Sequence, residues 1–154
     1  MISLNITALT RLAYATIPGF VERGAGTVIN ISSIVAIAPE ILNGVYGGTK
    51  AFVLGLSQSM HRELADKGIR IQAVLPGATA TDFWSEAGNP VENLPQEIVM
   101  TAEDMVDAAL VGLAMGEVVT IPGLHDGEQW DRYEAQRQVL SGLFGNSTSA
   151  PRYR

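Results

Sequence analysis

The sequence predicts an α/β fold built on a parallel β-sheet, and three observations support this prediction. Short apolar runs rich in β-branched residues occur at 27–32, 69–75 and 118–121, and such runs are typical of buried strands. Runs with helical periodicity precede, separate and follow them, and this alternation favours a parallel sheet with right-handed crossovers. The chain has 154 residues, 47% hydrophobic and 17% charged, which is enough for one domain with a core.

The first twenty residues predict a helix that leads into the first strand. Apolar residues recur at helical spacing from Ile2 to Ala13. Pro18 lacks a backbone N–H and is therefore expected to bend or end this helix near its last turn. The strand at 27–32 (TVINIS) is apolar on both faces, as in the interior of a sheet.

A long helix is expected over residues 46–66. Lys67 and Gly68 should end it, because a cation followed by a glycine suits a helix C-terminus. Its apolar residues form one broad arc, made of Phe52, Val53, Leu54, Leu56, Met60 and Leu64. A helix with so broad an apolar surface is expected to pack on two sides, one of them the sheet.

The rest of the chain predicts two more strands, at 69–75 and 118–121, and two more helices. The strand at 69–75 should stop at Pro76 and Gly77, and residues 82–96 are polar enough for a loop or a lid. Thr101, with Asp104 three residues on, predicts a capped helix that ends at Gly116. Its expected core-facing residues are Met105, Val106, Ala109, Leu110 and Leu113. A last helix is expected over residues 128–144, anchored by Trp130, Tyr133 and Val139, with an irregular tail over 145–154.

Composition and charge exclude several classes of function. The net charge is −6 and no Lys/Arg cluster exceeds two or three residues, which argues against nucleic-acid binding. No apolar run is long enough to cross a membrane, and the first residues lack the basic region of a signal peptide. The chain has no cysteine, so disulfides and thiolate metal sites are excluded. These features favour a cytoplasmic protein without membrane or nucleic-acid partners.

Ser33, Tyr46 and Lys50 form the candidate catalytic group. Ser33 follows the first strand, and Pro76-Gly77 follows the second. Because ligands of parallel α/β sheets bind beyond the carboxyl ends of the strands, these residues are expected at one edge. Tyr46 and Lys50 are four residues apart and should share a helix face about 5–6 Å apart at Cβ. The nearby cation should favour the phenolate, whose ordinary pKa is about 10.

Two other motifs have simpler explanations. The stretch GVYGGTK resembles a phosphate-binding loop, but Thr49 precedes Lys50 and the required spacing is not met. The stretch HDGE at 125–128 contains metal-ligand types, but nothing else with ligand spacing accompanies it. A surface turn is the better interpretation of HDGE, and no metal site is expected.

Taken together, these motifs resemble the short-chain dehydrogenase/reductase family. VINISS resembles the strand that leads to the family's catalytic serine, and YGGTK fits its Y-x-x-x-K signature thirteen residues later. LNITALTRL resembles the helix that carries the catalytic asparagine, here Asn5, and LPGATATDF resembles the P-G-x-x-x-T segment. The resemblance extends from Met1 to about Ile121. It implies a partial Rossmann-like, doubly wound parallel sheet of about three strands.

The resemblance also implies a role for each site residue. Tyr46 would be the acid–base group, and Lys50 would bind the nicotinamide ribose and lower the tyrosine pKa. Ser33 would orient the substrate carbonyl, and Asn5 would hold a water in a proton relay through Lys50. The cofactor, NAD or NADP, would also contact Pro76, Gly77, Thr79 and Thr81. The substrate, a small carbonyl or alcohol, would contact Ser33, Tyr46, Phe83 and Trp84.

The family's glycine-rich turn, T-G-x-x-x-G-x-G, does not occur in these 154 residues. The chain is therefore expected to correspond to the C-terminal half of the domain over 1–144, followed by the tail at 145–154. Cofactor binding is expected to be weak, and the choice between NAD and NADP is left open. A homodimer or larger homo-oligomer is expected. The alternative is a non-catalytic, oligomerising or scaffolding fragment of such an enzyme.

Overall fold

The computed structural model describes residues 1–42 and 44–154 and confirms the parallel α/β sheet. Its strands are β1 (Gly26–Ile31), β2 (Ile69–Val74) and β3 (Val119–Thr120), in the order β1-β2-β3. Both pairings are parallel, and β1 faces β2 over its whole length, from Gly26 opposite Ile69. Only Ala73 and Val74 are paired with β3. The carboxyl ends of all three strands therefore lie at one edge of the sheet.

The chain divides into two compact units, residues 1–123 and residues 124–154. All three strands lie in the first unit. The second unit contains α5 (Glu128–Ser141) and a short 3₁₀ turn, η6 (Pro151–Tyr153). The boundary expected at residue 144 therefore falls inside the second unit.

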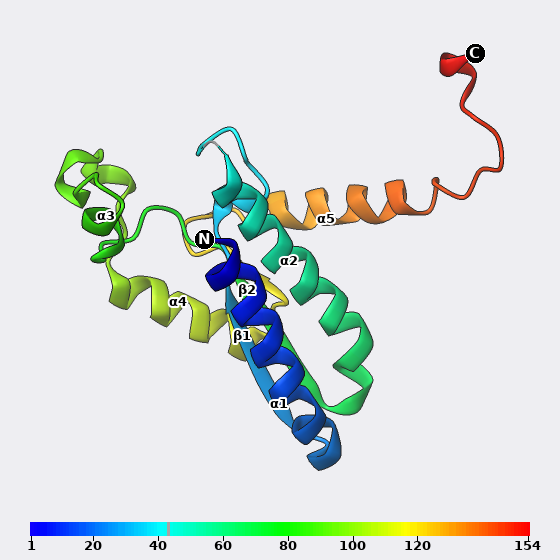
Figure 1. Cartoon of the computed structure of the whole chain (residues 1–154), viewed down its shortest axis with the longest axis horizontal. Helices are drawn as coiled ribbons and strands as arrows, with labels where there is room; N and C mark the ends of the chain where they lie inside the picture. Colours follow the sequence, from blue (N-terminus) through cyan, green and yellow to red (C-terminus); the bar gives the residue numbers. More distant parts are fainter. Residues whose placement is uncertain (43) are drawn as a thin grey trace. The chain divides into compact units, whose positions relative to one another are not determined.

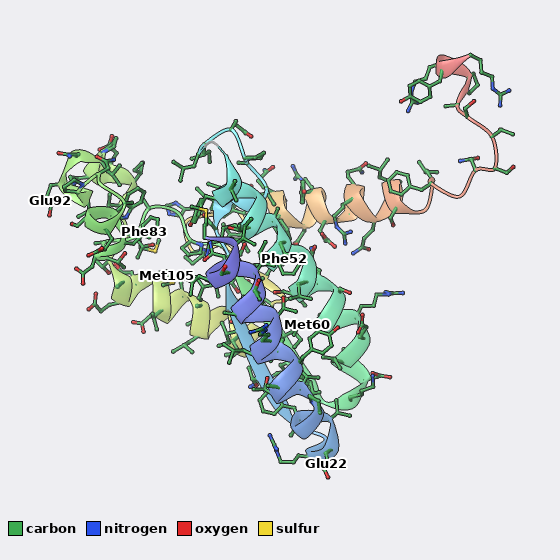
Figure 2. All side chains as sticks on the ribbon, viewed as in Figure 1. Glu22, Phe52, Met60, Phe83, Glu92 and Met105 are labelled. Carbon is green, nitrogen blue, oxygen red and sulfur yellow. The ribbon has the colours of Figure 1, made fainter. Side chains whose placement is uncertain are left out.

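Two helices cover one face of the sheet and enclose the main core. They are α1 (Leu9–Arg23) and α2 (Val45–Leu64), which lie side by side (Figure 1). A 3₁₀ turn, η3 (Ala65–Lys67), extends α2, and Gly68 ends it in the left-handed conformation, as expected. The core residues are Ala13 of α1, Met60 (labelled in Figure 2) and Leu64 of α2, and Ile69 and Ile71 of β2.

Pro18 was expected to bend or end the first helix, and it does not end it. A π-helical turn, η1 (Ser3–Ala8), leads into α1, and α1 continues past Pro18 to Arg23. A proline leaves the carbonyl four residues earlier without its helical donor. Here that residue is Tyr14, which is exposed, so water can satisfy its carbonyl. The helix ends instead at Gly24, whose φ of 65° places it in the left-handed region.

Helix α4 (Ala102–Met115) has the predicted cap but a different buried face. The Asp104 N–H donates to Thr101 Oγ1 at 3.0 Å, which confirms the N-cap. Among the residues expected in the core, however, Val106 and Leu110 are exposed. The buried face centres on Ala109 and Gly112, because the helix approaches the sheet closely there. The Gln72 side chain of β2 donates from Nε2 to the Ala109 carbonyl at 2.8 Å and to Thr120 Oγ1.

The remaining helical segments are short or exposed. The expected loop or lid at 82–96 contains α3 (Phe83–Glu86) and η4 (Val91–Asn93), and η5 (Gln96–Ile98) follows. The expectation that Trp130, Tyr133 and Val139 anchor the last helix is wrong, because α5 buries no residue. The surface of α5 is mainly polar, and its aromatic rings pack on each other, with the Trp130 and Tyr133 centroids 5.2 Å apart.

Two glycines in helices should respond to alanine in opposite ways. Alanine is favoured over glycine in a helix by about 1 kcal/mol. At Gly55, exposed on α2, a Cβ would meet no atom within 4 Å, so Gly55→Ala should raise the free energy of unfolding. At Gly112 a Cβ would collide with the side chains of Thr120 and Glu117.

Overpacking of this kind costs about 1–3 kcal/mol, so Gly112→Ala should lower the free energy of unfolding. Urea denaturation followed by circular dichroism measures both changes, and Gly55→Ala is the matched control. A Gly112→Ala protein as stable as Gly55→Ala would show that α4 does not approach β3 as closely as described.

Candidate active site

Ser33 is fixed just beyond the carboxyl end of β1. It has an extended backbone and caps a 3₁₀ turn, η2 (Ile34–Ala36), whose Val35 N–H donates to Ser33 Oγ at 3.4 Å. The Ile34 N–H donates to the Pro76 carbonyl at 3.1 Å, which joins this turn to the end of β2. Ser33 Oγ is 3.4 Å from the same carbonyl. These two contacts of the Ser33 hydroxyl with the backbone are long, so it remains available to a better-placed partner.

Tyr46 and Lys50 lie on the first turns of α2 and face this strand end. The side chains of Tyr46 and Ser33 lie close enough to interact, and this interaction acts to lower the pKa of Tyr46. The Lys50 ammonium lies 5.7 Å from the centroid of the Tyr46 ring and donates to the Ile31 carbonyl at 3.0 Å. The structure therefore brings Ser33, Tyr46 and Lys50 together at the carboxyl edge of β1. The helical spacing of four residues places the cation against the phenol ring.

Burial is the main influence on the protonation of Tyr46 in the ligand-free chain. Partial burial raises the pKa of Tyr46 above its ordinary value, because burial disfavours the phenolate, and the hydrogen bond from Ser33 lowers it by less. Burial also lowers the pKa of Lys50. In the ligand-free chain the pKa of Tyr46 is thus raised, and its lowering by Lys50 together with a bound nicotinamide stays a prediction. At neutral pH the phenol keeps its proton and can donate it.

The segment after β2 continues the edge of the site. Pro76 is half-buried beside Ser33, whereas Gly77 and Thr81 are exposed. The Thr79 side chain is buried, and its hydroxyl donates to the Gly77 carbonyl at 3.3 Å. Of the four residues expected to contact a cofactor on this segment, Gly77 and Thr81 are thus the ones open to a ligand.

Phe83 and Trp84 close one side of the site. The Phe83 ring, labelled on α3 in Figure 2, is 6.2 Å from the Tyr46 ring between centroids. Trp84 packs edge-on against Phe83 and donates from Nε1 to the Thr79 carbonyl at 2.9 Å. Phe83 therefore forms an apolar wall beside the phenol, and Trp84 ties the lid segment to the end of β2.

Asn5 contacts the helix that carries Tyr46 and Lys50 through Thr49, which was not among the residues expected in the site. Its amide Nδ2 donates to Thr49 Oγ1 at 3.0 Å. Ser32 was also missed, and its hydroxyl donates to the Lys50 carbonyl at 2.8 Å. The only signal for Thr49 and Ser32 in the sequence is that each is a hydroxyl residue next to a candidate catalytic residue, Lys50 or Ser33. Such residues often only bond locally to the backbone, so the signal is weak.

Other candidate sites are not supported. Among the described residues, no group of three or more histidine, cysteine or acidic side chains is arranged to hold a metal ion. No helix in the part of the chain that the structure describes is both long and apolar enough to cross a bilayer. A cavity of about 290 Å³ lies near the start of β2, lined by residues such as His61, Arg70 and Glu117. It is at the opposite end of β2 from the candidate active site.

Comparison with known sequences identifies related enzymes. The family profile described as short chain dehydrogenase matches residues 1–92. A very-long-chain 3-oxoacyl-CoA reductase from Rattus norvegicus is 42% identical over 115 residues, covering 73% of this chain and 35% of that protein. A serine 3-dehydrogenase from Rhizobium radiobacter is 40% identical over 83 residues, covering 54% of this chain and 33% of that protein. The chain spans about a third of the length of these curated relatives.

Comparison with solved structures agrees over almost the whole chain. A short-chain dehydrogenase from Sphingobium yanoikuyae in complex with NADPH is 50% identical, with a TM-score of 0.94. The match covers 99% of this chain and 59% of that one. A bulky-bulky ketone specific alcohol dehydrogenase from Comamonas testosteroni is 45% identical, with a TM-score of 0.86, over 99% of this chain and 56% of that one. The chain therefore belongs to the short-chain dehydrogenase family.

Proposed function

We propose that the chain carries the proton-transfer and nicotinamide-facing part of an NAD(P)-dependent oxidoreductase. The reaction is hydride transfer between the cofactor and a carbonyl/alcohol pair. The observation that carries this proposal is the Tyr46 phenol, which lies next to Ser33 and has the Lys50 ammonium 5.7 Å from the centroid of its ring. The complex of the Sphingobium relative with NADPH supports the choice of cofactor class.

Tyr46 is protonated at neutral pH, because its pKa lies above its ordinary value, and reduction of a carbonyl needs such a proton. When bound, the reduced nicotinamide supplies the hydride. Tyr46 gives its proton to the carbonyl oxygen, and the Ser33 hydroxyl orients that oxygen by donating a hydrogen bond to it. Lys50, already positioned at the end of β1, is the residue that would hold the ribose hydroxyls. Asn5, whose amide contacts Thr49 in the ligand-free chain, would hold a water in a proton relay through Lys50.

The segment after β2 fits the nicotinamide end of the cofactor. Gly77 and Thr81 are exposed beside the catalytic group, and a Cβ at Gly77 would have only the Ile34 side chain, at 3.7 Å, for a neighbour. Space for a ligand therefore exists over Gly77. The buried Thr79 hydroxyl holds the turn rather than the ligand, while Pro76 fixes the turn to η2.

The substrate we propose is a bulky, apolar ketone or the corresponding alcohol. Phe83 is about half exposed and stands beside the Tyr46 ring, so a carbonyl at the phenol would place one substituent against an aromatic face. Aromatic rings bind apolar and aromatic groups well. The likeness to the bulky-bulky ketone specific enzyme from Comamonas testosteroni supports this choice.

A second candidate function is a non-catalytic, self-associating fragment. Among the described residues, β1 pairs only with β2, so its outer edge is open. Val28 packs towards the core, but Ile29 and Ile31 are 39% and 46% exposed. Apolar edge strands of this kind associate with other chains. Self-association is compatible with either function, and we propose at least a homodimer.

Cofactor affinity separates the two functions. NADPH or NADH titrated into the 154-residue protein should bind with a millimolar dissociation constant, because the glycine-rich turn that holds the pyrophosphate does not occur in these residues. Each lost 1.4 kcal/mol of contacts weakens binding about tenfold. Lys50→Met should weaken binding further, whereas Lys67→Met, at the far end of α2, should not. Nicotinamide fluorescence measures the dissociation constant of the unmodified protein and of both variants. Binding with no dependence on Lys50 would favour the non-catalytic function.

Tyr46→Phe tests the assigned acid–base role. With a segment that cradles the cofactor pyrophosphate fused ahead of Met1, the protein should reduce a bulky ketone. Tyr46→Phe should lower kcat by about 10²–10⁴, the usual contribution of a positioned proton donor. Tyr133→Phe, on α5, should leave kcat unchanged, and circular dichroism checks that both variants fold. Turnover by Tyr46→Phe near the wild-type rate would rule out Tyr46 as the proton donor.

Self-association is tested by sedimentation velocity at tens of micromolar protein. The unmodified chain should sediment as a homodimer or larger species, because the open edge of β1 and its exposed Ile29 and Ile31 favour contact with another chain. Replacing Ile29 and Ile31 with threonine, which keeps strand propensity, should shift the protein towards monomer. Val139→Thr, on the exposed surface of α5, is the matched control. A monomer at this concentration in the unmodified protein would refute the proposal.

A further inference from the structure

Thr49 is a buried hydroxyl residue in the first turns of α2, between Tyr46 and Lys50. Its side chain is nearly inaccessible, with the residue 1% exposed. Thr49 Oγ1 donates to the Tyr46 carbonyl at 2.8 Å and accepts from Asn5 Nδ2 at 3.0 Å. The first bond is a common local bond within a helix. The second comes from a residue 44 positions away and ties two separate elements together.

The partner element is unusual. Asn5 lies within η1, the π-helical turn that precedes α1. Such turns are rare and frequently occur at functional sites. The bond from Asn5 fixes this wide turn against the start of α2, with which η1 is in contact. The Thr49 hydroxyl therefore links η1 to the Tyr46 carbonyl through two hydrogen bonds.

The start of α2 is held from a second side by the end of β1. Ser32 Oγ donates to the Lys50 carbonyl, and Lys50 Nζ donates to the Ile31 carbonyl. These two bonds restrain Lys50, but neither reaches Tyr46. The Thr49 hydroxyl is the side-chain contact that connects the backbone of Tyr46 to the neighbouring η1.

We propose that Thr49 is a positioning residue for Tyr46. Its hydroxyl is bonded to Asn5 and to the Tyr46 carbonyl, and these two bonds restrain the Tyr46 backbone so that the phenol stays next to Ser33. The importance of this position rests on the proposed proton transfer by Tyr46. The hydrogen bonds of Thr49 to Asn5 and to the Tyr46 carbonyl are present in the ligand-free chain. Thr49 touches neither the phenol oxygen nor, in this arrangement, any substrate, so it acts through Tyr46.

The chain contains a matched control two helical turns along α2. Ser57 is also fully buried, donates to the carbonyl of Val53 at 2.8 Å and accepts from Asn30 Nδ2 at 2.9 Å. It thus makes the same two kinds of bond as Thr49, within its helix and to an asparagine of another element. Removing either hydroxyl should cost stability, because a buried amide then loses its acceptor. Only the loss at Thr49 should affect Tyr46.

The test uses the ligand-free 154-residue protein with carbon-13 at the tyrosine Cζ atoms, followed by NMR as the pH is raised. Thr49→Val keeps the side-chain shape but removes the hydroxyl. It should shift the Tyr46 titration upwards, because the hydrogen bond from Ser33, which lowers the pKa of Tyr46, is weakened. Thr49→Ser should restore the wild-type titration. Ser57→Ala should lose stability in urea but leave the Tyr46 titration in place.

Asn5→Ala removes the same bond from its other end and should produce the same upward shift. The double variant with Thr49→Val should shift the titration no further than the larger single change, because both act through one bond. The proposal is overturned if Thr49→Val leaves the Tyr46 titration at its wild-type position, or if Ser57→Ala moves it equally. It is also overturned if neither Thr49→Val nor Asn5→Ala folds, since the role is then structural. Failure of the ketone reduction assay would overturn the proposed function without changing these titrations.

Discussion

The candidate site depends on one connection, the hydrogen bonds between the end of β1 and the start of α2. Ser32 Oγ donates to the Lys50 carbonyl at 2.8 Å, and Lys50 Nζ donates to the Ile31 carbonyl at 3.0 Å. Because both bonds form where the strand ends, the first turns of α2 stand directly over Ser33. The β-sheet sets the position of the strand end, and the helix sets the spacing of Tyr46 and Lys50.

Burial at this strand end explains the electrostatics of the site. Tyr46 and Lys50 are both partly withdrawn from water, which raises the pKa of the phenol and lowers the pKa of the ammonium. Both changes disfavour charge. Only the hydrogen bond from Ser33 opposes the change at Tyr46. At neutral pH the Tyr46 phenol therefore keeps its proton in the ligand-free chain.

Local sequence patterns predicted much of the fold and the site. β-branched runs located the strands, and the Thr101 cap and the glycines at 68 and 116 located helix ends. The pairing of Tyr46 with Lys50 followed from helical spacing, and their meeting with Ser33 followed from the parallel order of the strands. These features depend on residues close in sequence, or on a general rule of sheet topology.

The failures concern contacts between distant residues. The exposure of Val106 and Leu110 depends on Gly112, whose small size lets α4 approach Thr120. The continuation of α1 past Pro18 to Arg23 was also not predicted. The direction of the Tyr46 pKa required knowledge of burial, which is the largest cause of the upward shift. Thr49 could not be selected without Asn5 beside it.

The ionisation of Tyr46 in the ligand-free chain tests the account most directly. Carbon-13 NMR of labelled tyrosine Cζ, with the Tyr46 signal assigned through Tyr46→Phe, measures it residue by residue. The account predicts that Tyr46 titrates above the ordinary pKa of 10.0, and that Ser33→Ala moves the titration higher still. Ser59→Ala, an exposed serine on α2, should leave it unchanged. A Tyr46 pKa below 10.0, or no response to Ser33→Ala, would contradict the arrangement of Ser33, Tyr46 and Lys50 described above.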